Sequence, residues 1–275
     1  MPDSMIILEN VSAGYGKHKA GKPAEEALVV KEISFEIAQG HSVCLAGPNG
    51  SGKTTLLRVI AGLLPAHGEI LVDGKNISKI RRKEAASYMS FLSQMTRVYY
   101  SFSVYETVMQ GRYVHGGSFF SRRAASRDRE VVEETLESLG LQDLSGRQIT
   151  TLSGGQIQRV MLARCIAQES PVMILDEPLN YLDMKIQSEF IDYLFRWREK
   201  PVKTDWGKEY QPTIIGVFHD ISIAAFIADE VAMISEGRLL AFGEKKDVLT
   251  EEMLEKTYQF DAAGYLRKYR SCFSG

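Results

Sequence analysis

Gly47-Pro48-Asn49-Gly50-Ser51-Gly52-Lys53-Thr54 is the stretch that decides the fold, and it follows directly on the apolar run Ser42 to Ala46. It fits the G-x-x-x-x-G-K-[ST] pattern of a loop that binds phosphate between a strand and a helix. Its glycines let backbone N–H groups turn toward phosphate oxygens, and the helix predicted from Lys53 to about Gly62 favours an anion at its start. Lys53 can reach the β- and γ-phosphates of a nucleotide, while Thr54 can ligate Mg²⁺. The predicted phosphate-binding residues are Gly47, Pro48, Asn49, Gly50, Ser51, Gly52, Lys53, Thr54 and Thr55.

An acidic pair follows an apolar strand in the second half of the chain. Val172 to Leu175 is a continuous apolar run, typical of a strand buried on both faces of a parallel sheet, and it ends in Asp176 and Glu177. Ligands bind at this carboxyl edge of open parallel sheets. Asp176 is therefore predicted to hold Mg²⁺, and Glu177 to polarise the water that attacks the γ-phosphate of ATP. The pair is a weak signal alone and a strong one together with the phosphate loop.

The composition of the 275-residue chain is that of an ordinary globular protein, with 44% hydrophobic and 25% charged residues. A net charge of −2 and a pI near 6.3 disfavour nucleic acid as a partner. Cys44, Cys165 and Cys272 lack the spacing of a zinc site or a disulfide framework, which favours a reducing cytosol. No apolar run approaches the length of a membrane span, so we expect a partner to make any membrane contact.

Hydrophobic periodicity predicts one α/β core interrupted by helices. The β signal fades between Val104 and Ala167, where Asp128 to Leu139 has apolar residues at helical spacing. Two polar stretches, 18–26 and 203–211, are predicted to be surface loops. Gly68 to Gly74 is predicted to be a strand that ends in an Asp-Gly turn. The other predicted strands are Ile6 to Leu8, Ile33 to Ile37, Ser42 to Ala46, Val172 to Leu175 and Ile214 to Phe218.

Leu152-Ser153-Gly154-Gly155-Gln156 lies between the two motifs and opens a long helical pattern. Physically it is a second anion-binding device, with a serine hydroxyl and glycine N–H groups at a helix N-terminus. With the other two motifs in this order, the string resembles the signature of the ABC ATPase family over nearly the whole chain. The resemblance implies an α/β fold with a P-loop NTPase (RecA-like) core, a mixed and largely parallel sheet, a β subdomain and an inserted helical subdomain. We therefore expect one ABC ATPase domain over 1–275, with its nucleotide-binding core at 1–94 and 168–275 and its helical subdomain at 95–167.

The same resemblance assigns further residues to the nucleotide site. It implies that Ser153, Gly154, Gly155 and Gln156 contact the ATP of a second ATPase subunit, so that a homodimer forms on ATP. Asp183 then lies in the loop that crosses between the subunits. The other assignments are His219 as the switch histidine at the γ-phosphate, Gln94 as the glutamine that senses Mg²⁺ and water, and Tyr15 as the aromatic residue that stacks on adenine. The predicted catalytic residues are Glu177, His219 and Gln94, and the predicted metal-binding residues are Thr54, Gln94 and Asp176.

Two strings indicate the type of transporter. Ser103 to Val108, followed by Gly111-Arg112-Tyr113 with His115, resembles ATPases of bacterial importers for ferric siderophores, haem or cobalamin. Leu179 to Lys185 resembles the ferric-siderophore members. This implies a peripheral protein at the cytoplasmic face of the cell membrane, bound to an integral membrane permease and indirectly to a substrate-binding protein. We expect Tyr105 and Arg112 to contribute to permease association. His115, Tyr99 and Tyr100 are interpreted as helical-subdomain or docking residues rather than ligands of a metal or haem, because no carboxylate or thiolate is arranged around them.

Three alternatives stay open. Manganese, zinc and molybdate importers carry related strings after the predicted Gln94 position. A non-transport ABC ATPase would clamp DNA or a ribosome, but such proteins commonly have two fused ATPase domains, a coiled-coil insertion or a basic face. A small P-loop kinase would share the phosphate loop, but it would leave Leu152 to Gln156 and Glu177 unexplained.

Overall fold

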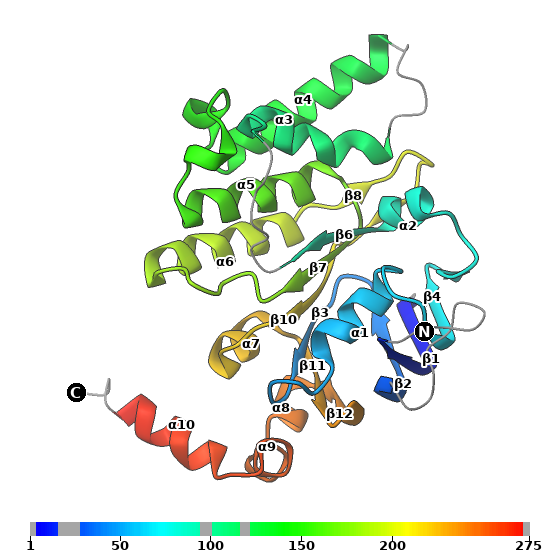
Figure 1. Cartoon of the computed structure of the whole chain (residues 1–275), viewed down its shortest axis with the longest axis vertical. Coiled ribbons are helices and arrows are strands. Elements are labelled where there is room, and N and C mark those ends of the chain that lie inside the picture. Colours follow the sequence, from blue (N-terminus) through cyan, green and yellow to red (C-terminus); the bar gives the residue numbers. More distant parts are fainter. Residues whose placement is uncertain (1–3, 16–27, 94–100, 116–121, 272–275) are drawn as a thin grey trace. The chain divides into compact units, whose positions relative to one another are not determined.

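The computed structural model of the chain describes residues 4–15, 28–93, 101–115 and 122–271 (Figure 1). They form two compact units, one made of Met1–Lys79 and Ile215–Gly275 and the other of Ile80–Ile214. Within the described ranges, none of the helices combines the length and the apolar character that a bilayer span requires. The predicted boundaries of the helical subdomain, 95 and 167, both lie inside the second unit and stay a prediction.

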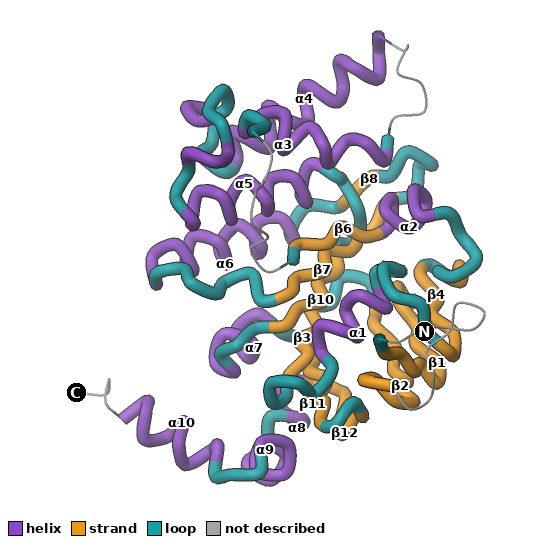
Figure 2. The backbone as a smooth tube through the Cα atoms, viewed as in Figure 1, coloured by secondary structure: helices purple, strands orange, loops and turns teal. Residues whose placement is uncertain are grey.

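The first unit contains an antiparallel sheet in the order β2-β1-β4-β5 and a second group of strands in which β11 pairs with β3 and β12 (Figure 2). β3 and β11 are parallel, whereas β11 and β12 are antiparallel. Its strands are β1 (Ser4–Gly14), β2 (Leu28–Ala38), β3 (Ser42–Ala46), β4 (His67–Val72), β5 (Lys75–Asn76), β11 (Glu230–Ser235) and β12 (Arg238–Glu244). Its helices are α1 (Lys53–Ile60), α7 (Ile221–Ile227), α8 (Lys245–Val248), α9 (Glu251–Tyr258) and α10 (Ala262–Ser271).

The two sheets of this unit follow different hydrophobic patterns. β2 buries Ile33, Phe35 and Ile37 and exposes the residues between them, as expected of an antiparallel strand with one solvated face. β3 is buried at every position, because it pairs in a sheet covered on both faces. The Asp73-Gly74 turn joins β4 to β5, and both residues have positive φ, 49° and 74°, the backbone conformation predicted for this dipeptide.

The second unit combines parallel strands with a group of helices. β6 (Met89–Leu92) and β7 (Val172–Asp176) pair in parallel, and β7 is buried throughout. In Figure 1, α5 and α6 lie side by side. The helices are α2 (Arg82–Tyr88), α3 (Val104–Met109), η3 (Gln110–Val114), α4 (Arg122–Ser138), η4 (Gln142–Leu144), η5 (Ile149–Thr151), α5 (Gly154–Ala167) and α6 (Met184–Arg198). The buried strand β10 (Thr213–Val217) carries the chain from the second unit back to the first.

The segment 203–211, predicted to be a surface loop, is largely exposed, but it is part of a hairpin rather than an irregular loop. This segment takes part in a hairpin of β8 (Val202–Lys203) and β9 (Glu209–Tyr210), in which Tyr210 is buried. Trp206 at the tip packs its ring 4.9 Å from that of buried Tyr88. Most polar residues of the segment stay exposed, as their composition predicted, while the aromatic rings of Trp206 and Tyr210 pack against the unit. The second predicted loop, 18–26, lies outside the described residues.

The two cysteines that the structure describes are buried and unreactive. Cys44 lies in β3 and Cys165 in α5, and neither forms a disulfide. Burial raises the pKa of both thiols, that of Cys165 to about 11. The reactive form of a cysteine is its thiolate, so these residues pack as small apolar groups.

The Arg112 side chain is a structural element of the second unit. Its guanidinium donates to Asp128 Oδ1 at 2.9 Å, to Glu169 Oε2 at 2.7 Å and to the carbonyl oxygen of Ala167 at 2.6 Å. The side chain is only 4% exposed. It therefore joins η3, α4 and the end of α5 from the inside. The expectation that Arg112 offers a docking surface does not fit this burial, because its donors are spent within the unit.

We predict that Arg112→Met lowers the free energy of unfolding by about 3–5 kcal/mol, because two carboxylates would lose their buried cation. Urea unfolding followed by circular dichroism measures this loss. Arg127→Ala is the matched control: Arg127 also pairs with Glu169, at 3.1 Å, but is 55% exposed. The control should cost less than about 1 kcal/mol. Equal losses in the two variants would contradict the structural role of Arg112.

Candidate nucleotide site

The phosphate loop needs a backbone that only glycine can adopt. Gly47 has φ 145°, and a Cβ at this position would lie 1.9 Å from the carbonyl oxygen of Ile234. Gly52 has φ 101°, and its Cβ would meet the Val29 carbonyl oxygen at 3.0 Å. Side chains are thus excluded from both ends of the loop. What the loop presents is backbone, which is the requirement for cradling an anion.

The start of α1 is prepared for a negatively charged group. Its N-cap is Gly52, and no side chain caps the first turn. The first N–H groups of an α-helix point away from its body, and the helix dipole favours an anion beside them. Ser51 Oγ is buried and has no hydrogen-bond partner. A phosphate fits these donors, because buried polar groups in native proteins are normally satisfied.

Lys53 folds back over the loop. Its ammonium donates to the carbonyl oxygens of Gly47 and Pro48, both at 2.8 Å. The side chain is 9% exposed, so this cation is held beside the donors of the loop rather than in bulk solvent. A triphosphate would add acceptors of higher charge density to the same cation.

Neighbouring elements of the first unit hold the loop in place. The turn between β11 and β12 supplies the N–H of Gly237, which donates to the Ser51 carbonyl oxygen at 3.1 Å. Tyr258, at the end of α9, hydrogen-bonds with the backbone of Gly47. Burial raises the pKa of Tyr258, so its hydroxyl stays neutral, while the bond to Gly47 acts in the opposite direction. Nothing in the local sequence around Tyr258 marks it as a contact of a loop about two hundred positions away, so this residue was not predicted.

Tyr15, predicted to stack on adenine, lies just after β1 with 50% of its surface exposed. Its hydroxyl accepts a hydrogen bond of 3.1 Å from Arg58 of α1. The ring is therefore held next to the helix that follows the phosphate loop, with a face available to a flat ligand. The bond to Arg58 is a contact that the sequence pattern did not reveal.

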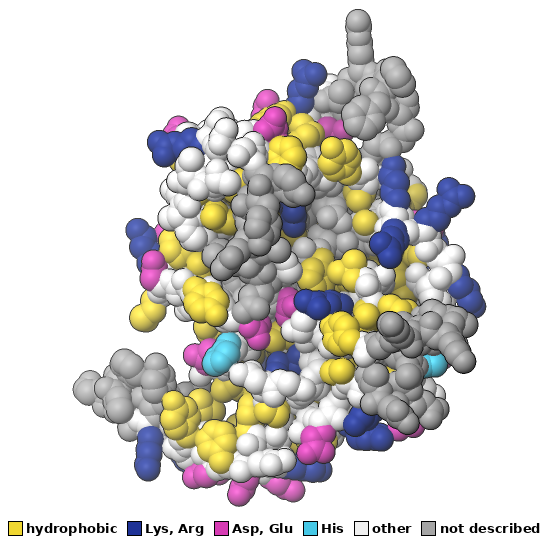
Figure 3. All heavy atoms as spheres, viewed as in Figure 1, with side chains coloured by type: hydrophobic (Ala, Val, Ile, Leu, Met, Phe, Trp, Pro, Cys, Tyr) yellow, Lys and Arg dark blue, Asp and Glu magenta, His cyan; other side chains and the backbone are white. Residues whose placement is uncertain are grey.

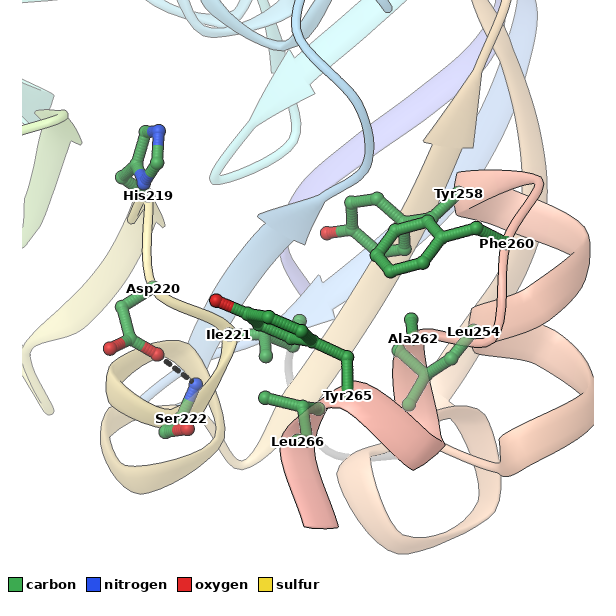
Figure 4. Close-up of a pocket in the computed structure, with 10 residues that line it drawn as sticks. All are labelled: His219, Asp220, Ile221, Ser222, Leu254, Tyr258, Phe260, Ala262, Tyr265 and Leu266. Atoms are coloured by element: carbon green, nitrogen blue, oxygen red, sulfur yellow. Dashed lines mark hydrogen bonds between the residues drawn. The ribbon is translucent and has the colours of Figure 1, made fainter. Parts of the chain in front are cut away.

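His219 lies at the mouth of a pocket of about 420 Å³ in the first unit (Figure 4). Beside it, Asp220 caps α7 by accepting from the Ser222 N–H at 2.6 Å. The opposite wall is aromatic, with Phe260 lying 6.5 Å from Tyr258 and 6.4 Å from Tyr265, centroid to centroid. Figure 3 shows hydrophobic side chains on the surface in the region of α9 and α10. His219 itself is exposed and is therefore accessible to a ligand.

The acidic pair lies at the end of β7. Asp176 is 4% exposed, and Glu177 follows it in a left-handed backbone conformation with φ 51°. Asn180 Nδ2 donates to Glu177 Oε2 at 2.6 Å. The sequence analysis named both carboxylates but not Asn180. An asparagine three residues after an acidic pair is too common in sequences to identify Asn180 as a hydrogen-bond partner of Glu177.

The signature string forms a capping box at the start of α5. Ser153 Oγ accepts from the Gln156 N–H at 3.3 Å, and Gln156 Oε1 accepts from the Ser153 N–H at 2.9 Å. A hydroxyl that accepts a bond keeps its own hydrogen as a donor. Ser153 can therefore both cap the helix and donate to an anion. Asp183 caps α6 by accepting from the Ile186 N–H at 2.9 Å.

The predicted Mg²⁺ ligands offer only oxygen. Thr54 lies in the first turn of α1 and Asp176 at the end of β7, whereas Gln94 lies outside the described residues. Over the ranges that the structure covers, no cluster of three or more His, Cys, Asp or Glu side chains could hold a metal ion. Thr54 and Asp176 each supply an oxygen, the type of ligand that suits Mg²⁺, an ion that keeps several waters and takes its other ligands from substrate phosphates.

The segment after the Gln94 position begins with a second capping box. Ser103 Oγ accepts from the Glu106 N–H at 3.1 Å, and Glu106 Oε2 accepts from the Ser103 N–H at 2.8 Å. Bonds from the Ser103 backbone and hydroxyl hold the pKa of Glu106 below its usual value. Tyr105 lies beside a pocket of about 530 Å³ whose lining includes four glutamates, and burial, with the Glu133 charge, raises the pKa of Tyr105. The four are Glu130, Glu133, Glu134 and Glu137.

A family model described as ABC transporter matches residues 30–180, more than half of the chain and the span that holds the phosphate loop, the signature string and the acidic pair. The chain belongs to the ABC transporter family. The resemblance inferred from the three motifs is thereby confirmed. As the ATP-binding subunit of an ABC transporter, the protein is an ATPase.

Relatives of this ABC ATPase match it along nearly their whole length. The ferric enterobactin transport ATP-binding protein FepC of Escherichia coli K12 is 34% identical over 251 residues, 91% of this chain and 85% of FepC. The manganese transport system ATP-binding protein MntB of Halalkalibacterium halodurans is 34% identical over 266 residues, 96% of each chain. The structure of cbiO1 from Clostridium perfringens, part of the transporter complex cbiONQ, has a TM-score of 0.72 at 27% identity and covers 92% of this chain and 94% of cbiO1. The predicted fold class is confirmed.

We predict that Lys53→Ala weakens ATP binding at least about 100-fold, because each lost charge-assisted hydrogen bond is worth about 1.5–3 kcal/mol. Titration with a fluorescent ATP analogue measures the affinity. Lys79→Ala is the matched control, since Lys79 is 74% exposed in the same unit and pairs only loosely with Glu69, at 3.7 Å. Wild-type affinity in Lys53→Ala would show that the loop is not the phosphate site.

Proposed function

We propose that this ABC ATPase powers a bacterial importer: two copies close on ATP, hydrolyse it, and drive a membrane permease that takes up a ferric siderophore, haem or cobalamin. The observation that carries this proposal is the phosphate loop, whose glycine backbone, uncapped helix start and buried Lys53 form a cradle for a triphosphate. In this proposal Glu177 and His219 supply the hydrolytic chemistry, and Ser153 contacts the ATP of the partner subunit.

The hydrolytic step follows from the residue types. Glu177 accepts a proton from water as the water oxygen bonds to the γ-phosphorus, and the electron pair of the broken P–O bond leaves with ADP. His219 hydrogen-bonds the γ-phosphate, and Tyr15 stacks on the adenine ring. Mg²⁺, held by Thr54, Asp176 and Gln94, would neutralise phosphate charge when bound. The backbone of the phosphate loop and Lys53 orient the triphosphate.

The second subunit completes each site in this proposal. Ser153 is exposed at the start of α5. Its hydroxyl and the N–H groups of Gly154 and Gly155 can donate hydrogen bonds to an anion there. The proposed ligand is the γ-phosphate of the ATP held by the partner's phosphate loop. ATP then binds the two subunits together, and its hydrolysis releases them. Asp183, which caps α6, lies in the loop that would cross between them.

The cargo is proposed from the relatives. FepC and the iron(3+)-hydroxamate import protein FhuC of Bacillus subtilis, 32% identical over 94% of this chain, carry siderophore or hydroxamate transport in their names. The manganese protein MntB matches at the same identity as FepC and over more of the chain, so a manganese importer is the second candidate. Uptake of ⁵⁵Fe-siderophore and of ⁵⁴Mn in cells that lack the gene separates the two.

The proposed permease contact lies at Tyr105 and the four glutamates around it. Their negative charge suits a basic cytoplasmic segment of a membrane protein. The subunit is then peripheral, at the cytoplasmic face of the membrane, and its contact with a substrate-binding protein is indirect.

We predict that Glu177→Gln lowers ATP hydrolysis by about 10²- to 10⁴-fold, because the amide cannot accept the proton. It also removes a like charge near the γ-phosphate, worth on the order of 3 kcal/mol at about 5 Å before screening. The variant should form an ATP-dependent dimer by light scattering, and Lys53→Ala added to it should abolish the dimer. Glu199→Gln, an exposed glutamate of the same unit, should behave as wild type. Hydrolysis by Glu177→Gln at the wild-type rate would rule out Glu177 as the base.

We predict that the subunit floats with membranes only when its permease is co-expressed, because it would bind lipid through that partner. Tyr105→Ala should release it from permease-containing vesicles and leave its ATP affinity unchanged. Tyr113→Ala is the control, since Tyr113 is a tyrosine of the same unit that is 66% exposed and lies outside the acidic pocket. Flotation of the lone subunit with lipid vesicles would contradict the proposed mode of attachment.

A further inference from the structure

The backbone of Glu177 is in a conformation that is unfavourable for a glutamate. Its φ of 51° lies in the left-handed region, which is unfavourable for a side chain with a Cβ. Glu177 also precedes Pro178, and a residue before proline prefers extended backbone. Tyr181, four residues later, has φ 63°. Such a conformation persists only when the surroundings over-determine it.

Three side-chain amides hold this loop, and their hydrogen-bond acceptors are three successive residues of it. Asn180 Nδ2 donates to the Glu177 carboxylate at 2.6 Å, Gln158 Nε2 to the Pro178 carbonyl oxygen at 2.7 Å, and Gln187 Nε2 to the Leu179 carbonyl oxygen at 3.2 Å. Gln158 belongs to α5 and Gln187 to α6, the two helices that lie side by side in Figure 1. Asn180 belongs to the loop itself. We refer to Gln158, Asn180 and Gln187 as the amide clamp.

Within the clamp, Asn180 and Gln158 have different tasks. The bond from Asn180 is a charge-assisted one to the carboxylate, so it fixes the rotamer of the side chain that would take the proton. Gln158 is 3% exposed and lies five residues after Ser153 on the signature helix, so it fixes the backbone under that carboxylate. A general base works only within hydrogen-bond reach of its proton, which makes both tasks relevant to rate.

We propose that Asn180 is the positioning residue for the Glu177 carboxylate and that Gln158 ties the base to the signature helix of the same chain. The proposal rests on the proposed role of Glu177 as general base. In this arrangement, a displacement of the start of α5, such as capture of a phosphate by Ser153, reaches Glu177 through one buried hydrogen bond rather than through the partner subunit.

The first test is steady-state ATP hydrolysis by the purified full-length subunit. Asn180→Ala should lower kcat by about 10²-fold, the effect of a misplaced reacting group, with KM for ATP unchanged. Asn180→Asp has nearly the same shape but replaces the donor with a like charge, so it should be at least as slow. Asn180→Ser, which keeps a donor, should recover part of the rate. Gln211→Ala, an exposed amide of the same unit, should match wild type.

A double-mutant cycle separates positioning from general structure. If Asn180 acts through the carboxylate, Asn180→Ala should have no further effect on the residual rate of Glu177→Gln. Gln158→Met, which keeps the volume, should show the same non-additivity, and thermal unfolding of each variant checks that the fold persists. Additive losses in kcat, or wild-type kcat in Asn180→Asp, would overturn the inference.

The cycle also distinguishes this inference from the proposed function. A slow Glu177→Gln together with a fast Asn180→Ala overturns the positioning role and leaves the base in place. A wild-type rate in Glu177→Gln overturns the base and the inference with it. A rise in KM that equals the fall in kcat/KM would assign Asn180 to ATP binding instead and would also overturn the positioning role.

Discussion

The exclusion of side chains from the predicted phosphate loop is the constraint on which the first unit depends. Donors can converge on an anion only where no Cβ intervenes, and at Gly47 a Cβ would lie 1.9 Å from the Ile234 carbonyl oxygen. The loop must therefore be packed this tightly to hold its shape. β11 and the turn after it, Tyr258 of α9 and the Lys53 ammonium all serve that packing. Elements remote in sequence, such as β11 and α9, thus help to keep the eight residues of the loop, 47–54, in one conformation.

The loop after β7 solves a different problem with different means. There the proposed functional group is the side chain of Glu177, so its direction matters as well as its position. Glu177 has a positive φ, and no glycine relieves it. Side-chain amides from α5, from α6 and from the loop itself supply the compensating hydrogen bonds. The phosphate loop owes its conformation to the backbone freedom of its glycines. The loop that carries Glu177 is instead held in its conformation by hydrogen bonds from side-chain amides.

Capped helix starts recur at the proposed functional sites of the second unit. Ser103 with Glu106 and Ser153 with Gln156 form capping boxes, and Asp183 caps α6. A capped helix start is rigid, and its dipole favours negative charge. The Ser153 start is suited to an anion by its glycines, whereas the Ser103 start precedes Tyr105 and its glutamates. The same local motif thus occurs beside two different surfaces, one with the glycine N–H groups of α5 and one lined by the glutamates of α4.

The sequence by itself determined what depends on neighbours along the chain. The glycine spacing of the phosphate loop, the buried strand before Asp176 and the helix start at Ser153 are local patterns, and local backbone preferences were enough to place β3, α1, β7 and α5. Only the tertiary structure decided which distant groups meet. It placed Arg112 inside the unit with Asp128 and Glu169, Tyr210 in a buried hairpin, Tyr258 on Gly47, and Gln158 on Pro178. These contacts join residues far apart in sequence, and hydrogen bonding and burial at such contacts depend on the packed geometry rather than on any period or motif.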